Sequence, residues 1–246
     1  MSDAIAVKDL CKTFGSQRVL NGIDLHIPEG ETFVLLGRSG TGKSVFLKLI
    51  VGLQKPDSGS IRVHDQEMTE LPIEKLNETR RQIGFLFQEG ALYDSLSLGQ
   101  NVAFPLRRQK DMSEKDKLDR ARELLNQVGM EKDFDKMPSE ISGGMKKRAG
   151  LARALALDPD ILLFDEPTAG LDPITANEIN QLILKLHGER HATAVVVTHD
   201  LRGAQTISDR VAMIHQGDIL IEGSYDELKN SKQEFVTQFF SQEGRD

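Results

Sequence analysis

Eight consecutive residues near the start of the chain have the types and spacing needed to hold a phosphate group. They are Gly37, Arg38, Ser39, Gly40, Thr41, Gly42, Lys43 and Ser44. The glycines let backbone N–H groups converge on phosphate oxygens at a helix start, and Lys43 adds a mobile positive charge. Ser44 is left to ligate Mg²⁺. The alternative, a glycine-rich turn with an exposed lysine, is disfavoured because an apolar strand pattern precedes the segment and an apolar helix pattern follows it.

Two adjacent carboxylates follow a second apolar run. Asp165 and Glu166 come directly after residues 161–164, at the edge where a parallel sheet opens toward ligand. In a phosphoryl-transfer site Asp165 would hold Mg²⁺, directly or through water, and Glu166 would polarise the attacking water. Taken alone, the same pair would be typical of a helix cap. His199 follows the run at 193–198 at the equivalent edge, and it gains weight only as a member of this set.

A second helix start can also bind an anion. Ser142, Gly143 and Gly144 precede a strongly patterned helix, so they present free backbone N–H groups. Lys43 and Ser142 are 142 − 43 = 99 positions apart. This spacing leaves open whether the two anion-binding segments meet within one chain or across a dimer.

Short β-branched runs alternate with helical patterns along the chain. The expected strands are 32–36, 83–87, 161–164, 193–198 and 211–214, and the expected helices are 44–53, 145–157 and 173–187. This alternation predicts an α/β fold in which a largely parallel sheet is covered on both faces. A Gly-Asp turn at 217–218 predicts an antiparallel hairpin near the C-terminal end of that sheet.

Two further segments are expected to be helical. Residues 107–136 place apolar side chains at helical spacing, and their basic and acidic groups nearly cancel, which indicates a solvated face rather than a binding patch. Residues 225–240 predict an amphipathic helix that packs on the body of the protein or on a partner, with core packing favoured. Its apolar residues are Leu228, Phe235, Val236, Phe239 and Phe240.

Composition limits the class of protein. The chain has 246 residues, 39% of them hydrophobic and 28% charged, with a net charge of −7. These values predict a globular protein and argue against a general nucleic-acid binder, although not against a local basic site. Cys11 is the single cysteine, which excludes an internal disulfide and suits a reducing compartment. The N-terminus lacks a secretory pattern and no apolar run reaches about 20 residues, so we expect any membrane role to come through a partner.

The ordered motifs resemble those of the ATP-binding cassette (ABC) superfamily, over about residues 4–222. The resemblance implies a P-loop NTPase cassette with a mostly parallel core sheet, an antiparallel β part and an inserted α-helical subdomain. We expect a single ABC ATPase domain over residues 1–246, with the helical subdomain at about 90–158 inserted in a RecA-like core. The implied activity is ATP hydrolysis coupled to transport, with ATP and Mg²⁺.

The resemblance also implies roles for single residues. Phe14 would stack on adenine, Gln88 would sense Mg²⁺ and the transport subunit, and His199 would act as a γ-phosphate switch. The implied catalytic residues are Glu166, His199 and Gln88, and the implied metal ligands are Ser44, Gln88 and Asp165. The segment 37–44 would bind the phosphates of ATP.

Family membership further implies a homodimer that sandwiches two ATP molecules. Ser142, Gly143 and Gly144 lie in the signature motif, which would face the phosphate loop of the second copy. Asp172 belongs to a loop that would pass between the subunits. Closure of the dimer would then depend on ATP.

This chain departs from the family pattern at a few positions. Phe14 stands where tyrosine is commoner, but stacking uses only the ring. Ile141 and Met145 replace the usual leucine and glutamine of the signature, and methionine cannot donate the hydrogen bonds of glutamine. The basic residues at 146–148 could add a phosphate contact, but we expect them to be solvated on an exposed helix turn.

A finer resemblance concerns the transported substrate. Residues 87–97 and 100–106, with the methionine signature, are similar to ATPases of bacterial lipid transporters associated with mammalian-cell-entry (Mce) proteins, whose best-known branch maintains outer-membrane lipid asymmetry. This resemblance implies phospholipid transport, two integral membrane permease subunits, an Mce-domain lipid-binding protein and a small regulatory subunit. It places the chain peripherally on the cytoplasmic side of a bacterial inner membrane.

Two alternatives remain open at this stage. The chain could serve a transporter for another substrate, or act as a soluble ABC ATPase switch in DNA repair or translation. Repair relatives insert a long coiled coil between phosphate loop and signature, whereas no sustained heptads occur here. Translation relatives usually join two cassettes, and this chain holds one. Both observations disfavour a soluble switch.

Overall fold

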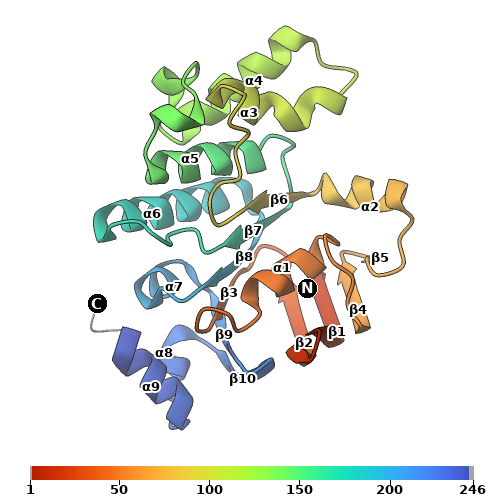
Figure 1. Ribbon diagram of the computed structural model, residues 1–246, viewed down its shortest axis with the longest axis vertical. Coiled ribbons are helices and arrows are strands. Elements are labelled where there is room, and N and C mark those ends of the chain that lie inside the picture. The colour runs from red at the N-terminus through yellow and green to blue at the C-terminus, as the bar shows by residue number, and fades with distance from the viewer. Residues whose placement is uncertain (1, 244–246) are drawn as a thin grey trace.

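A six-stranded sheet forms the centre of the computed structural model, which describes residues 2–243 (Figure 1). Its strand order is β10-β9-β3-β8-β7-β6, and all neighbours pair in parallel except β10, which forms an antiparallel hairpin with β9. The strands are β3 (Thr32–Leu36), β6 (Ile83–Leu86), β7 (Ile161–Asp165), β8 (Thr193–Thr198), β9 (Arg210–His215) and β10 (Asp218–Gly223). The expected α/β class, parallel sheet and hairpin are confirmed.

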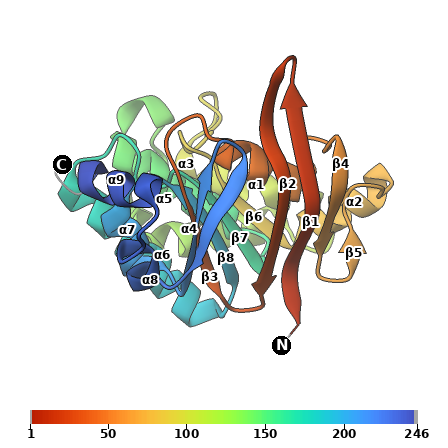
Figure 2. The same ribbon diagram turned by 90° about the horizontal axis from the view of Figure 1, so that it is seen from below.

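A second, antiparallel sheet has the order β2-β1-β4-β5 and contains a long hairpin, drawn in red in Figure 2. Its strands are β1 (Asp3–Phe14), β2 (Gln17–Pro28), β4 (Ser58–Val63) and β5 (Gln66–Glu67). The buried face of this sheet shares one apolar cluster with helix α1 (Lys43–Ile50) and with Phe33 and Leu35 of β3. Helix α1 therefore packs between the two sheets.

The other face of the central sheet is also covered. Val34 and Leu36 point to this side and join a cluster with helices α6 (Pro173–Arg190) and α7 (Leu201–Ile207). Strand β3 thus alternates between two cores, and all five of its residues are buried. Short helix α2 (Ile73–Arg80) leads into β6.

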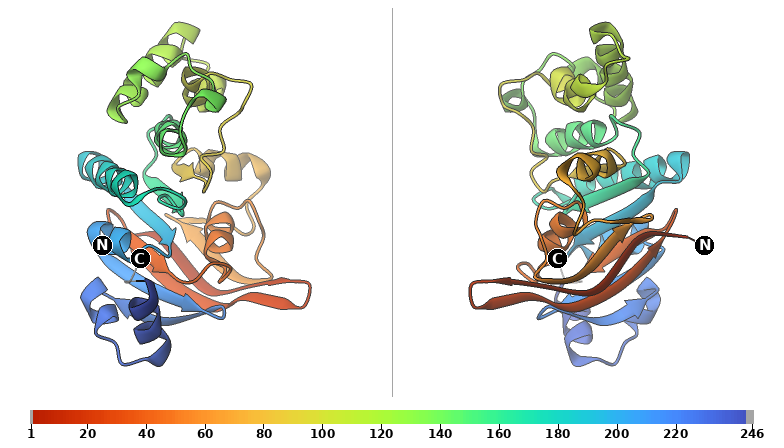
Figure 3. Two further views of the ribbon diagram at one scale, coloured as in Figure 1. Left: turned by 60° about the vertical axis from the view of Figure 1, so that its left-hand side comes forward. Right: turned by 90° about the vertical axis from the view of Figure 1, so that its right-hand side faces the viewer.

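Between β6 and β7 lies a helical insertion, residues 98–154, at the end of the molecule opposite the C-terminal helices (Figures 1 and 3). It holds α3 (Leu98–Ala103), the 3-10 helices 104–108, 131–133 and 138–140, α4 (Glu114–Gln127) and α5 (Gly143–Ala154). The helical character expected for residues 107–136 is seen in α4 and in the 3-10 helices on either side of it. Leu124 and Leu125 of α4 are fully buried, whereas Leu118 on the same helix is 39% exposed.

The C-terminal segment forms two helices instead of the one expected. Helix α8 (Tyr225–Lys229) ends at Asn230, and α9 (Glu234–Glu243) begins after a turn in which Gln233 N donates to Ser231 Oγ at 3.2 Å. Leu228, Val236 and Phe239 are fully buried, so the expected core packing is confirmed. No helix among residues 2–243 combines the length and apolar character needed to cross a membrane.

Candidate active site

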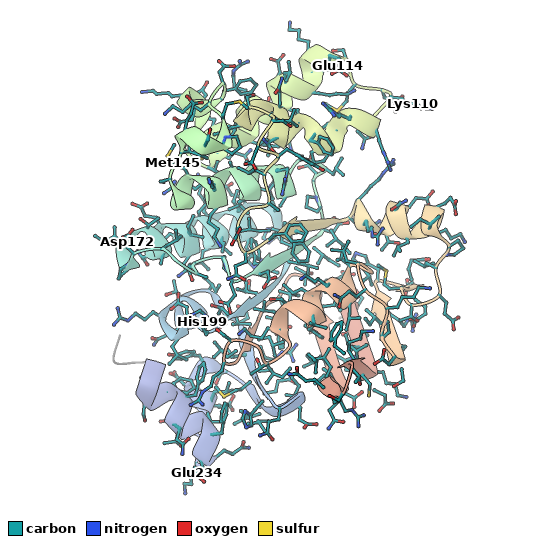
Figure 4. The ribbon with its side chains drawn as sticks, in the orientation of Figure 1. Lys110, Glu114, Met145, Asp172, His199 and Glu234 are labelled. Atoms are coloured by element: carbon teal, nitrogen blue, oxygen red, sulfur yellow. The ribbon has the colours of Figure 1, made fainter. Side chains whose placement is uncertain are left out.

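The sheet order brings three separated motifs to one edge. Strands β3, β8 and β7 are parallel neighbours, so the segments that leave their carboxyl ends lie side by side. These segments are the phosphate loop after β3, His199 after β8 (labelled in Figure 4), and Asp165 with Glu166 at the end of β7. The clearest contact joins residues 121 positions apart: Ser44 Oγ donates to Asp165 Oδ1 at 2.6 Å.

The phosphate loop folds around the ammonium of Lys43. This side chain is 4% exposed, and its Nζ donates to the carbonyl oxygens of Gly37 at 2.7 Å and Arg38 at 3.1 Å. Gly42 has φ +100°, and a Cβ there would lie 2.8 Å from Val19 Cγ1, so the turn into α1 requires glycine. At Gly40, φ +81°, a Cβ would meet nothing within 4 Å, which leaves a cradle open above the loop.

The cradle continues into a cleft of about 340 Å³. Its lining includes Gly40, Lys43, Ser44, Gln88, Glu166 and His199. These residues come from the phosphate loop, the segment after β6 and the ends of β7 and β8. The structure therefore gathers most of the expected phosphate-binding and catalytic residues around one space.

Glu166 is the most constrained member of the cleft. It is 6% exposed, its Oε1 lies 3.0 Å from Lys43 Nζ, and its Oε2 lies 3.0 Å from His199 Nδ1. Burial alone would raise the pKa of this carboxyl, but the hydrogen bond to His199 and the charge of Lys43 outweigh burial and lower it. Glu166 is therefore a carboxylate anion that lies between the Lys43 ammonium and the His199 imidazole.

The backbone of Glu166 is strained. Its φ is +48°, a left-handed conformation that costs a non-glycine residue about 1–3 kcal/mol. The residue also precedes Pro167, and a following proline favours extended backbone instead. The glutamate N–H donates to Val197 O of β8 at 2.9 Å, which contributes to offsetting the strain.

Asp165 and Ser44 fit a magnesium ion. Burial raises the pKa of the Asp165 carboxyl, and the Ser44 hydroxyl acts in the opposite direction. A hydroxyl and a carboxylate are the hard oxygen ligands that Mg²⁺ prefers, usually together with water and substrate phosphates. Within residues 2–243 no cluster of three or more His, Cys, Asp or Glu could hold a metal without such help. The donors present therefore suit a metal that arrives with a nucleotide.

Two of the residues expected to bind ATP, Phe14 and Arg38, make contacts outside the cleft. Phe14 ends β1, is 45% exposed and has Lys12 Nζ 5.4 Å from its ring centroid, outside the lining of the cleft. The Arg38 guanidinium lies 5.3 Å from the ring centroid of Phe235 in α9. Gln17 and Val19, which the motifs did not indicate, line the cleft from the β1–β2 hairpin. Only the pairing of β1 with β2 brings them there.

The second anion-binding segment lies apart from this cleft. Ser142 caps α5, with its Oγ accepting from Met145 N at 3.3 Å, so the helix begins two residues earlier than predicted. Ser142 and Gly143 are exposed, whereas Gly144 is buried. None of the three lines the cleft. Met145 and Asp172 mark this side of the molecule in Figure 4.

Asp172 supports the start of α5 from the neighbouring helix. It caps α6 by accepting hydrogen bonds from Ile174 N and Thr175 N, both at 3.1 Å, and from Thr175 Oγ1 at 2.6 Å. A Cβ at Gly144 would lie 2.6 Å from Thr175 Cγ2, so the two helices approach closely at this point. The start of α5 and the start of α6 therefore lie side by side on this face of the molecule.

The expectation that residues 146–148 are solvated is wrong for Lys147. This lysine is 4% exposed, and its Nζ donates to the main-chain oxygen of Glu166 at 2.9 Å. Arg148 is half-buried and bonds to Val128 O and Glu178. The helical pattern offered the missing signal, because Gly144, Lys147 and Leu151 share one face of α5 and all are buried.

The family is shown by comparison with known proteins. A profile of the ABC transporter family matches residues 20–169, and the chain belongs to this family. It is 45% identical to the probable ribonucleotide transport ATP-binding protein mkl of Mycobacterium leprae, over 98% of this chain and 70% of that protein. It is 37% identical to the sulfate/thiosulfate import ATP-binding protein CysA of Vibrio vulnificus, over 98% of this chain and 70% of the relative.

A solved structure agrees with the fold. The dimeric post-hydrolysis state of the ATP-binding cassette MJ0796, bound to ADP and Pi, superposes with a TM-score of 0.83 at 34% identity, over 90% of this chain and 98% of that one. The chain is thus the ATP-binding subunit of an ABC transporter. It binds ATP with Mg²⁺ and hydrolyses it.

Proposed function

We propose that this chain is the ATPase of a phospholipid transporter of the Mce type. Two copies would bind two permease subunits on the cytoplasmic side of a bacterial inner membrane, with an Mce-domain lipid-binding protein and a small regulatory subunit as further partners. The observation that carries the ATPase part is the cleft in which Lys43, Ser44, Asp165 and Glu166 converge.

Each residue of the cleft has a chemical role in this proposal. Lys43 moves from Glu166 to the β- and γ-phosphates when ATP enters. Ser44 and Asp165, with Gln88, would hold Mg²⁺, which would supply charge stabilisation when bound. Glu166 is then free to accept a hydrogen bond from a water placed in line with the γ-phosphorus. His199, whose Nδ1 lies 3.0 Å from Glu166 Oε2, would turn toward the γ-phosphate.

The signature segment completes the site from a second copy. Ser142 and Gly143 are exposed at the start of α5, and the positive end of the helix dipole lies there. Neither lines the cleft of its own chain, whereas an incoming second copy could set them against the γ-phosphate. Asp172 lies in the adjoining loop between the copies. The dimeric structure of MJ0796 supports this arrangement.

A groove suits a permease segment. It has a volume of about 450 Å³ and lies where β6 meets the segment 90–158, which we assign as the helical subdomain. Two aromatic pairs line it, Phe85 with Phe87 and Tyr93 with Phe104, with ring centroids 4.2 and 4.5 Å apart. Exposed aromatic rings beside polar groups are typical of docking surfaces. Gln88 directly follows Phe87, so the groove and the cleft adjoin.

The wall of this groove is held in place by buried polar groups. Arg153 donates to the carbonyl oxygens of Ala91 at 2.7 Å and Gly90 at 2.8 Å. Asn101, fully buried on α3, accepts from Tyr93 N at 2.7 Å and donates to the carbonyl oxygens of Tyr93, Leu96 and Ser97. A permease would therefore meet a preformed surface.

The phospholipid substrate rests on the similarity of residues 87–106 and the methionine signature to Mce-associated ATPases. The two relatives described above are named for ribonucleotide transport and for sulfate and thiosulfate import, and these substrates compete with phospholipid. In this proposal the subunit contacts the permease and not the transported substrate. The substrate must therefore be identified from the whole transport complex.

The test is to purify the intact complex. We would tag the Glu166→Gln variant, extract membranes with mild detergent, and identify co-purifying proteins and lipids by mass spectrometry. A multi-span permease, an Mce-domain protein and enriched phospholipid are expected. A permease with another binding protein would retain the transporter and reject the lipid cargo. Soluble partners alone would reject the transporter and favour an ATPase switch. A Phe104→Ala variant that keeps ATP binding but loses the permease would support the groove.

A further inference from the structure

Lys147 is a buried charge that the roles proposed above do not use. Only 4% of it is exposed, and its Nζ donates to the main-chain carbonyl oxygen of Glu166 at 2.9 Å. Burial lowers the pKa of this ammonium, while the negative charges of Glu166, Asp165 and Glu89 act in the opposite direction. A charge is costly to bury, so an apolar side chain at this position would be the simpler choice for packing alone.

The oxygen that Lys147 holds belongs to the strained residue of the cleft. Glu166 has φ +48° and precedes Pro167. Its N–H is fixed by Val197 O of β8 at 2.9 Å, and its carbonyl accepts from Lys147 Nζ and from Ala169 N at 3.2 Å. The peptide groups on both sides of the Glu166 Cα are therefore anchored, one by the sheet and the other by α5 and the turn at 166–169.

The direction of the glutamate side chain follows from these anchors. With φ and both peptide planes fixed, the Cα–Cβ bond points into the cleft, and the carboxylate reaches Lys43 and His199, each at 3.0 Å. Relaxation of the 166–167 peptide toward the extended backbone that a following proline favours would turn this bond away. A small rotation about the Glu166 Cα would displace the carboxylate oxygens. A displacement of about 1 Å is enough to misalign the attacking water and slow the reaction.

We propose that Lys147 is a positioning residue for ATP hydrolysis: by bonding to the carbonyl of Glu166 it holds that residue in the left-handed conformation that aims its carboxylate into the cleft. The inference rests on the proposed role of Glu166 as the group that polarises water. Lys147 itself lines neither the cleft nor its entrance. It acts through Glu166.

The position of Lys147 on α5 adds a second consequence. Ser142, five residues earlier, caps the same helix and would face the nucleotide of the second copy. If that nucleotide displaced α5, Lys147 would move together with the helix. One side chain thus connects the nucleotide at the partner's phosphate loop to the carboxylate at this chain's own site.

The test compares two substitutions of Lys147 with a matched control. Lys147→Met keeps an unbranched side chain, one heavy atom shorter, and removes the donor, whereas Lys147→Gln keeps a neutral donor. Lys146→Met removes the same charge from the adjacent, half-exposed position. For each variant we would measure kcat, the Kd for Mg·ATP and the melting temperature. Lys147→Met is expected to lower kcat by about 10-fold or more while Kd changes by less than about 3-fold. Lys147→Gln is expected to recover part of kcat, and Lys146→Met to leave both constants unchanged.

Other outcomes separate the two proposals. A Lys147→Met variant with wild-type kcat, beside an inactive Glu166→Gln variant, overturns the role of Lys147 and leaves that of Glu166 intact. Wild-type hydrolysis by Glu166→Gln overturns both. If Lys147→Met does not fold, Lys147→Gln provides the test. A folded Lys147→Gln variant with a lower kcat and an unchanged Kd supports the positioning role. A variant in which kcat falls, ATP binding weakens and the melting temperature drops together indicates a packing role and overturns the proposal.

Discussion

The chain presents two helix starts of a kind that binds phosphate, and they differ in how much of a site each one carries. At α1, Lys43 is buried against Glu166, and Ser44 is bonded to Asp165. At α5, Ser142 and Gly143 are exposed, and the Ser142 hydroxyl caps its own helix. The first is an assembled site whose parts come from five segments of the chain. The second is a surface whose ligand must be brought to it.

The first site requires only that the chain folds, whereas the second requires that two copies associate. The partners of Lys43 are supplied by the parallel order of β3, β8 and β7, so every folded copy has them. In the proposed dimer, the start of α5 would meet a phosphate only when a second copy brings its bound ATP. Substitutions in the first region should therefore change nucleotide affinity or chemistry in a single chain, and substitutions in the second should change only the assembled pair.

The largest effect is expected at Glu166. Glu166→Gln keeps the size of the side chain but cannot polarise water as a carboxylate does, so kcat should fall by about 10²–10⁴-fold. Nucleotide should remain bound, because Lys43 loses a competing anion. Steady-state phosphate release and gel filtration with Mg·ATP measure both effects, and a closed dimer is expected. Rapid turnover by this variant would remove Glu166 from the role.

The next effect is expected at Lys43. Lys43→Ala removes the buried cation of the phosphate loop, and affinity for Mg·ATP should fall by about 100-fold or more. Isothermal titration with a non-hydrolysable analogue measures the change. Lys55→Ala, at an exposed position, is the control and should bind normally. Unchanged affinity of Lys43→Ala would contradict the phosphate-loop assignment.

Mixing two inactive variants tests the comparison itself. Ser142→Asp keeps a good helix cap but places a negative charge where the second copy's phosphate is expected. Lys43→Ala leaves the start of α5 intact. Each variant alone should hydrolyse little ATP, but half of the dimers in an equal mixture combine both chains and hold one intact composite site. About a quarter of wild-type activity should return. No recovery would mean that the site does not form across the dimer.

The smallest effect is expected at Asp172, which supports the start of α5. Hydrogen bonds from Thr175 lower the pKa of the Asp172 carboxyl below its ordinary 3.8. A lowered pKa contributes stability that is present above pH 3.8 and is lost as the pH falls through the folded-state value. Asp172→Asn should therefore lower the melting temperature by on the order of 1 °C near pH 7, and the difference should vanish in strong acid. A difference that is constant with pH would assign it to packing instead.

Much of the assembled site could be predicted because its residues lie in short motifs that directly follow strand patterns in the sequence. Glycines and a lysine at 37–44 follow a strand pattern, and the carboxylates at 165–166 follow another, so parallel pairing is enough to bring them together. Gln17 and Val19 could not be found in this way, since they reach the cleft through the register of a hairpin. Lys147 was misjudged because residue type was weighed above the helical face it occupies.

The ends of the helices were predicted less well than the helices themselves, because they depend on contacts outside the local sequence pattern. The start of α5 depends on the cap at Ser142, and the break between α8 and α9 depends on a turn at Ser231. Such details are set by tertiary contacts, which apolar periodicity does not record.

The buried amide of Asn101 has a mechanical consequence. It ties Tyr93, Leu96 and Ser97 to α3 through one side chain, so the loop beside the groove is stiff. A flexible loop would change its own conformation when the cassette moves, so less of that movement would reach the permease. A loop held in one conformation would transmit the movement of the cassette to the permease. The efficiency with which each ATP is converted into movement of a permease would thus be set by a residue that touches neither.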